Sequence, residues 1–200
     1  MYVGQHAFEE RALRLKPKDK ARIAQRIREA AAGLFRARGI AAVTLDELMG
    51  ASGLTRGAFY AHYRSKDALV AEVLRHEHPL LSMLAAREGA DAEALRVQMR
   101  RIFRDYLTPA HLPAIYEGCT LASLTGEAAR GGAAQREAFE AAVEAILTEM
   151  ARGRPGPDRA RHLAALLRAS GAVNAAMACR REAMRAEILA GAWRDVEPAL

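Results

Sequence analysis

The chain has 200 residues, of which 51% are hydrophobic and 27% charged, enough for one or two domains with a sizeable core. Its net charge of +6 lies entirely in residues 1–75, which carry 14 Lys and Arg against 8 Asp and Glu, while residues 76–200 carry 16 of each. Two distant cysteines exclude a disulfide framework, and the lack of a long apolar run or a signal-peptide core predicts a cytoplasmic protein without a membrane partner.

The first predicted helix spans residues 19–38 and follows a basic arm, residues 1–18. Ile23, Ile27 and Leu34 share one face of this helix, and Gly39 ends it. The basic residues between 11 and 28 are either a solvated helix face or part of an arm that contacts DNA phosphates or the minor groove.

Two short helices are predicted next, at residues 44–51 and 55–62. Thr44 and Glu47 have the spacing of a capping box, and Thr55 is a suitable cap for the second helix. Gly53 supplies the positive φ that the tight turn between them needs. Two short helices joined by a glycine turn predict a helix-turn-helix, whose second helix fits the major groove of DNA.

The rest of the chain also reads as helices, at residues 65–85, 91–107, 116–130, 132–152, 157–178 and 181–195. Ser65 caps the first of these, and Pro79 is expected to kink or shorten it. β-branched residues are scarce and no alternating strand pattern occurs, so we predict an all-α fold of about nine helices. We expect a DNA-binding domain at 19–75 and a separate helical domain at 76–200.

The segment Gly-Leu-Thr-Arg-Gly-Ala-Phe-Tyr-Ala-His-Tyr-Arg-Ser-Lys-Asp-Ala-Leu, residues 53–69, resembles the signature of the TetR family of bacterial regulators. The resemblance extends upstream to cover roughly residues 19–75, with Met49 where the family usually has Ala. It implies a homodimeric transcriptional regulator, more often a repressor than an activator. Such a regulator binds a palindromic double-stranded DNA operator and is released by a small-molecule effector bound in the C-terminal domain, here of apolar or electrophilic character.

We expect DNA contacts from residues at the start of a helix or on the outer face of the second short helix. These residues are Thr44, Thr55, Arg56, Gly57, Tyr60, His62 and Lys66. Arg56 is predicted to read guanine O6 and N7 with two hydrogen bonds. Lys66 opens a helix, where its charge and the helix dipole both favour a phosphate. By resemblance, Tyr60 and His62 contact phosphates, whereas Phe59 and Tyr63 are predicted to be core.

The last two predicted helices carry apolar and small residues at helical spacing. The family arrangement implies that they form a four-helix dimer interface through Leu163, Leu167, Ser170, Asn174, Met177, Met184 and Ile188. An ordinary monomer core would produce the same pattern.

The effector pocket is predicted from apolar residues of the C-terminal domain: Met83, Met99, Phe103, Tyr106, Tyr116 and Cys119. Core packing explains each of them equally well. Cys119 lies in a Gly-Cys-x-Leu segment that resembles one branch of the family, in which some members sense electrophiles or oxidants. A thiol at a helix N-terminus is more readily deprotonated, although a lone cysteine is commonly an inert small hydrophobe.

Other classes of protein find little support in the sequence. There is no Gly-x-Ser-x-Gly elbow and no phosphate-binding glycine loop, so neither an enzyme nor a cofactor is expected. Glu72, His76 and His78 come nearest to a metal cluster, but their spacing does not place all three on one helix face. The alternative function is a helical module that binds DNA without sequence preference, or binds a protein, without ligand control.

Overall fold

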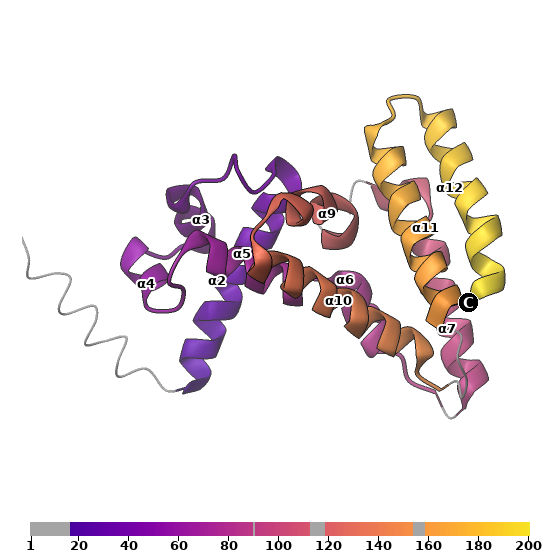
Figure 1. Ribbon diagram of the computed structural model, residues 1–200, viewed down its shortest axis with the longest axis horizontal. Coiled ribbons are helices and arrows are strands. Elements are labelled where there is room, and N and C mark those ends of the chain that lie inside the picture. The colour runs from indigo at the N-terminus through magenta and orange to yellow at the C-terminus, as the bar shows by residue number, and fades with distance from the viewer. Residues whose placement is uncertain (1–16, 90, 113–118, 154–158) are drawn as a thin grey trace, which may run out of the picture. The chain divides into compact units, whose positions relative to one another are not determined.

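The computed structural model describes residues 17–89, 91–112, 119–153 and 159–200, and every regular element in these ranges is helical (Figure 1). This confirms the predicted all-α class. The basic arm, Tyr116 and the linker at 154–158 fall largely outside the described residues, except that Pro17 and Lys18 already belong to the first helix. No helix within the described ranges is long and apolar enough to span a membrane.

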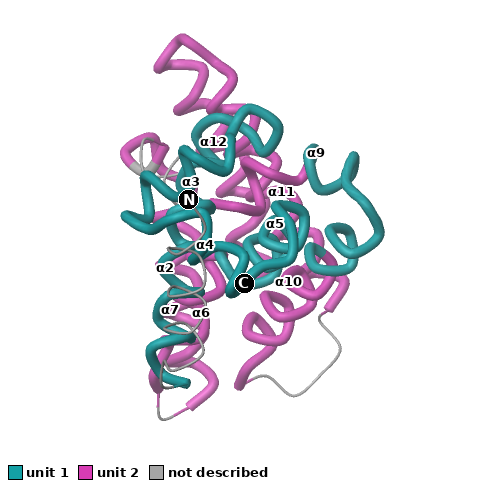
Figure 2. Tube along the Cα trace, turned by 90° about the vertical axis from the view of Figure 1, so that its left-hand side faces the viewer, with its two compact units in different colours: residues 1–77, 126–139 teal, residues 78–125, 140–200 magenta. Residues whose placement is uncertain are grey.

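The chain divides into two compact units (Figure 2). The first contains the chain up to Glu77 together with residues 126–139, and the second contains residues 78–125 and 140–200. The chain therefore passes from one unit to the other within α9 (Thr120–Arg130) and again within α10 (Ala133–Ala151). Residues 126–139, assigned to the C-terminal domain by the sequence prediction, group with the helix-turn-helix.

The first unit is built around α2 (Pro17–Arg38), which packs against α3 (Leu45–Ser52) and α5 (Lys66–His76). The buried face of α2 includes Ile27 and Phe35, and that of α5 includes Leu69 and Val73. Gly39 ends α2 with φ +81°, and a Cβ there would lie 2.6 Å from Glu127 Oε1. The left-handed conformation favours glycine at this position, and any larger residue would also displace the Glu127 carboxylate.

The segment at residues 126–139 is joined to the rest of the first unit by two polar contacts. Glu127 Oε2 accepts a hydrogen bond from the Ile40 N–H at 2.7 Å, and Gln135 Nε2 donates to Asp67 Oδ1 at 3.3 Å. The loop after α2 is therefore held from the end of α9 as well as from its own neighbours.

The predicted helix at 65–85 is two helices, α5 and α6 (Pro79–Ala85). Pro79 occupies the first turn of α6, where its missing N–H costs nothing, so the chain breaks before the proline, as predicted. The second unit continues with α7 (Ala92–Tyr106), the 3₁₀ turn η1 (Pro109–His111), α11 (Arg159–Ala178), α12 (Glu182–Val196) and η2 (Glu197–Ala199). Helices α11 and α12 pack together along their length.

Arg87 links three segments of the second unit and was not foreseen from the sequence. It is only 3% exposed, and its guanidinium donates to the carbonyl oxygens of Leu84 at 2.9 Å, Leu95 at 3.0 Å and Glu149. A buried charge satisfied by three carbonyls fixes the ends of α6 and α10 near the start of α7.

Candidate nucleic-acid interface

The turn between α3 and α4 (Arg56–Tyr60) is fixed by its backbone. Gly53 has φ +62°; its N–H donates to Gly50 O at 3.1 Å, and the Leu54 N–H donates to Met49 O at 3.0 Å. This pair of bonds is a Schellman motif, which ends α3 and redirects the chain. Thr55 Oγ1 then accepts from the Ala58 N–H at 3.4 Å and starts α4. The predicted helix-turn-helix is therefore present, with both predicted caps.

One face of α4 is buried. Phe59 is 1% exposed, and its ring lies 5.7 Å from that of Tyr63, whose hydroxyl donates to Ala24 O at 3.0 Å. These contacts anchor α4 to α2 and confirm that Phe59 and Tyr63 are core residues. Met49, where the family usually has Ala, is also buried, so the longer side chain is accommodated in the core.

The opposite face of α4 lies in solvent. Thr55, Arg56, Gly57 and Tyr60 are all exposed, and the large aromatic ring of Tyr60 is 63% exposed. His62 is half-buried, and desolvation together with the positive charge of Lys20 lowers its pKa. His62 is therefore harder to protonate here than an exposed histidine.

Arg56 forms a bidentate ion pair with Asp46, in the first turn of α3. Its Nε donates to Oδ1 at 2.5 Å and its Nη2 donates to Oδ2 at 2.6 Å. The hydrogen bond from Arg56 lowers the pKa of Asp46, so both groups are charged at neutral pH. Sequence reasoning treated Arg56 as a lone side chain and missed this partner.

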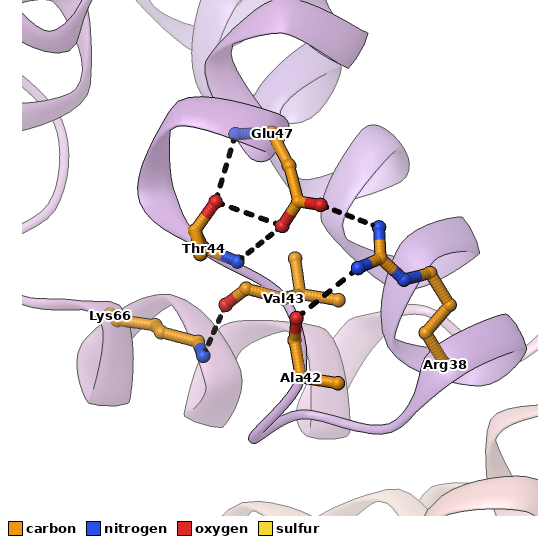
Figure 3. Close-up of polar contacts among 6 residues, drawn as sticks. All are labelled: Arg38, Ala42, Val43, Thr44, Glu47 and Lys66. Atoms are coloured by element: carbon orange, nitrogen blue, oxygen red, sulfur yellow. Dashed lines mark hydrogen bonds and ion pairs between the residues drawn. The ribbon is translucent and has the colours of Figure 1, made fainter.

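Thr44 and Glu47 form the predicted capping box at the start of α3 (Figure 3). The Thr44 N–H and hydroxyl both donate to Glu47 Oε2 at 2.8 Å, while the Glu47 N–H donates to Thr44 Oγ1 at 3.3 Å. Arg38 adds a bond to Glu47 Oε1 at 2.8 Å. These bonds, led by that from the Thr44 N–H, lower the pKa of Glu47 to about 2. Both donors through which Thr44 was expected to reach a phosphate are engaged here within the protein.

Lys66 also turns toward the protein. Its Nζ donates to Val43 O at 2.5 Å (Figure 3). It also donates to Ile40 O at 2.5 Å and lies 5.9 Å from the centre of the Phe35 ring. The ammonium group therefore holds the loop between α2 and α3 from the first turn of α5. The sequence suggested a phosphate contact because it showed the helix start but not the loop beside it.

The predicted effector residues of the second unit mostly lie in its core. Met99, Phe103, Tyr106 and Cys119 are buried, whereas Met83 is 39% exposed and Tyr116 lies outside the described residues. The Tyr106 hydroxyl and Cys119 Sγ are 2.7 Å apart, and Sγ also accepts from the Ala122 N–H at 3.3 Å, at the start of α9.

A hollow of the second unit lies away from these residues. It has a volume of about 460 Å³ and is lined by Leu147, Thr148, Glu149, Ala151, Arg152 and Arg159, none of which was predicted to bind an effector. No group of three or more His, Cys, Asp or Glu side chains within the described ranges could hold a metal ion.

The predicted dimer residues lie on α11 and α12 with varied exposure. Leu167 is 56% exposed and Ser170 is buried; Leu163, Met177, Met184 and Ile188 are half-buried. Asn174 donates to the carbonyl oxygen of Ala122 at 2.5 Å, so its amide holds α11 to α9 within one subunit. Part of the apolar surface of α11 and α12 is therefore exposed to solvent, at Leu167 and the half-buried residues near it.

Known proteins match both the helix-turn-helix segment and the fold. Residues 27–73, which run from α2 through most of α5, match the family model of bacterial regulatory proteins, tetR family. The helix-turn-helix segment of the chain therefore belongs to the TetR family. This confirms the resemblance seen in the sequence, and the family consists of transcription factors rather than enzymes.

A 57-residue stretch of this TetR-family protein is 42% identical to the HTH-type transcriptional regulator SrpR of Pseudomonas putida. That match covers 28% of this chain and 27% of SrpR. Over most of the chain the likeness is one of fold. The structure of reduced NemR from E. coli matches 88% of this chain and 96% of its own, with a TM-score of 0.65 and 17% identity. SmeT, the repressor of the Stenotrophomonas maltophilia multidrug efflux pump SmeDEF, matches 88% of each chain, with a TM-score of 0.54 and 22% identity.

Proposed function

We propose that this TetR-family protein acts in the cytoplasm as a homodimeric repressor that binds a palindromic operator and is released by a small-molecule effector. The observation that carries the proposal is the two-sided character of α4. Phe59 fixes one side in the core together with Tyr63, which follows the helix, while Arg56, Gly57 and Tyr60 are exposed on the other side. A short, rigidly held helix with an exposed arginine at its start is suited to the major groove.

The charge distribution supports DNA as the partner. The whole net charge of +6 belongs to residues 1–75, which include the helix-turn-helix. A basic excess confined to one segment attracts phosphates and orients the protein on the duplex before any base is read. Arg56 is assigned to base readout, and Thr55, Tyr60 and His62 to the neighbouring backbone.

Two residues that the sequence predicts to contact DNA take a smaller part in this proposal. Thr44 and Lys66 bond to the protein itself, so we assign them to shaping the helix-turn-helix, with a phosphate contact only as a secondary role.

A homodimer is proposed from the helix pair α11 and α12. Leu167 is the only strongly exposed leucine among the described residues, and it stands on the face predicted to meet a second copy. Two copies related by a two-fold axis would present two recognition helices to the two halves of a palindrome.

Repression and effector release are proposed by likeness to the family and its members, such as SmeT, which is described as a repressor. The buried residues Met99, Phe103 and Tyr106 would give an effector site an apolar lining, and the Cys119 thiol beside Tyr106 would give it a group that reacts with electrophiles. An effector would release DNA by favouring a dimer whose recognition helices no longer match the half-site spacing.

Selection of bound sequences from a random double-stranded DNA pool tests the proposal, with wild type and Arg56→Ala in parallel. The proposal expects a palindrome from wild type and a relaxed base preference at one position of each half-site from the variant. Retention of DNA without enrichment by either protein would instead support the alternative of non-specific DNA binding.

A further inference from the structure

Arg56 and Asp46 form a bidentate charged pair on the exposed side of the helix-turn-helix. They come from different helices, ten residues apart, and meet through two parallel hydrogen bonds of 2.5 and 2.6 Å. Their side chains are 63% and 68% exposed. An ion pair this open to water contributes little to folding stability, so its main effect is on the direction in which the guanidinium points.

The bonds to Asp46 leave the right donors available. A guanidinium has five N–H groups in one plane, and the pair uses the Nε–H and one N–H of Nη2. The edge formed by Nη1 and the second N–H of Nη2 stays open. That edge is the one that reaches guanine O6 and N7 together, so a single guanidinium accommodates both the carboxylate and the base.

The Asp46 carboxylate also affects how Arg56 interacts with DNA that lacks the operator sequence. Asp46 neutralises the charge of Arg56 and places a negative group next to the DNA-facing surface, which disfavours simple phosphate contact. When Arg56 is held in this way, it contributes to DNA affinity chiefly where a guanine lies against its open edge.

We propose that Asp46 is a positioning residue that sets base specificity by holding Arg56 with its distal edge toward a guanine. This inference rests on the proposed function, because it requires α4 to read an operator. It adds a specificity determinant that lies outside the recognition helix, in the first turn of α3.

The test measures binding of Asp46→Asn to the selected operator, to its three single-base variants at the position that Arg56→Ala relaxes, and to an unrelated duplex. Asn keeps the size of the side chain but removes the charge and one acceptor. We expect discrimination at that position to fall about tenfold, within the range that one bidentate arginine–guanine contact supplies. Discrimination at other positions should be unchanged, and binding to the unrelated duplex should tighten.

Asp19→Asn is the matched control, because Asp19 is also an acid of the first unit that pairs with an arginine, Arg22, at 3.2 Å. It should tighten binding to the unrelated duplex in the same way and leave base discrimination intact. In an Arg56→Ala background, Asp46→Asn should change discrimination no further. Thermal melts of all variants matching wild type would show that folding is preserved.

The possible failures are distinguishable. Full guanine discrimination in Asp46→Asn, with a selective wild type, would overturn the positioning role and leave the proposed function standing. Sharper discrimination with tighter operator binding would also overturn it, because Asp46 would then only sequester Arg56 in the protein without DNA. A wild type with no base preference would overturn both the proposed function and this inference.

Discussion

Replacing Lys66 with Met separates a structural role from a DNA-contacting one. The substitution keeps the unbranched stem beside Phe35 but removes the ammonium group that donates to Ile40 O and Val43 O at 2.5 Å each. Those carbonyls belong to the loop that leads into α3, so the substitution weakens the contacts that hold the start of the helix-turn-helix.

The size of the effect follows from these contacts. A hydrogen bond to a charged group contributes about 1.5–3 kcal/mol when well shielded, but Lys66 is half-buried and water can replace part of what is lost. We therefore expect Lys66→Met to reduce the free energy of unfolding by about 2 kcal/mol, including the weak attraction to the Phe35 ring. In a chain of this length that corresponds to a fall in melting temperature of about 4–8 °C.

This change in stability is measured by thermal and urea unfolding without DNA, monitored by the circular dichroism of the helices. Lys18→Met is the matched control, because Lys18 is an exposed lysine of α2, and it should unfold with wild type. Stability of Lys66→Met within about 0.5 kcal/mol of wild type, as for an ordinary surface substitution, would refute the structural role. If Lys66 only contacts a phosphate, Lys66→Met should be as stable as wild type. The salt dependence of its operator binding should then show the release of about one counterion fewer.

Further substitutions test three other features of the structure. Because its pKa is lowered to about 2, chiefly by the Thr44 N–H, Glu47 contributes stability that is fully present above pH 4.5 and lost as the pH falls toward 2. Thermal melts should thus find Glu47→Gln less stable than wild type at pH 7, with the difference narrowing below pH 4.5; a constant difference would contradict this. Arg87→Met removes the buried guanidinium that donates to three carbonyls and should lower the free energy of urea unfolding by about 3 kcal/mol; a loss below about 1 kcal/mol would contradict the role of this buried charge. Gly53→Ala forces alanine into φ +62° and should cost about 1–2 kcal/mol. Gly50→Ala, inside α3 with open space around its Cβ, should instead stabilise the protein. Equal melting temperatures for the two variants would refute the role of the left-handed conformation at Gly53.

The helix-turn-helix could be predicted closely because its signals are local. The capping box of Thr44 and Glu47, the glycine at 53 and the cap at Thr55 each act within a few residues, and all three form as predicted. Pro79 likewise breaks the chain where its own chemistry requires. Such signals depend on the neighbouring backbone alone, so no knowledge of the rest of the fold is needed.

The contacts that sequence reasoning missed join residues far apart in the chain. Glu127 reaches Ile40 across 87 positions, and Arg87 reaches Glu149 across 62. Lys66 meets a loop more than 20 residues away, which is why its helix-start position suggested a phosphate contact instead. No periodicity or spacing records these partners. The same reason leaves the effector site open, because an apolar helix residue looks alike in a core and in a pocket.

The proposed function requires that this protein recognise one DNA sequence through α4. The most direct test is an equilibrium titration of the protein with the selected operator and with a scrambled duplex of the same composition, at about 0.15 M salt. The account predicts at least about a thousandfold preference for the operator, with two chains bound to each duplex. Equal affinity for the two duplexes would contradict it.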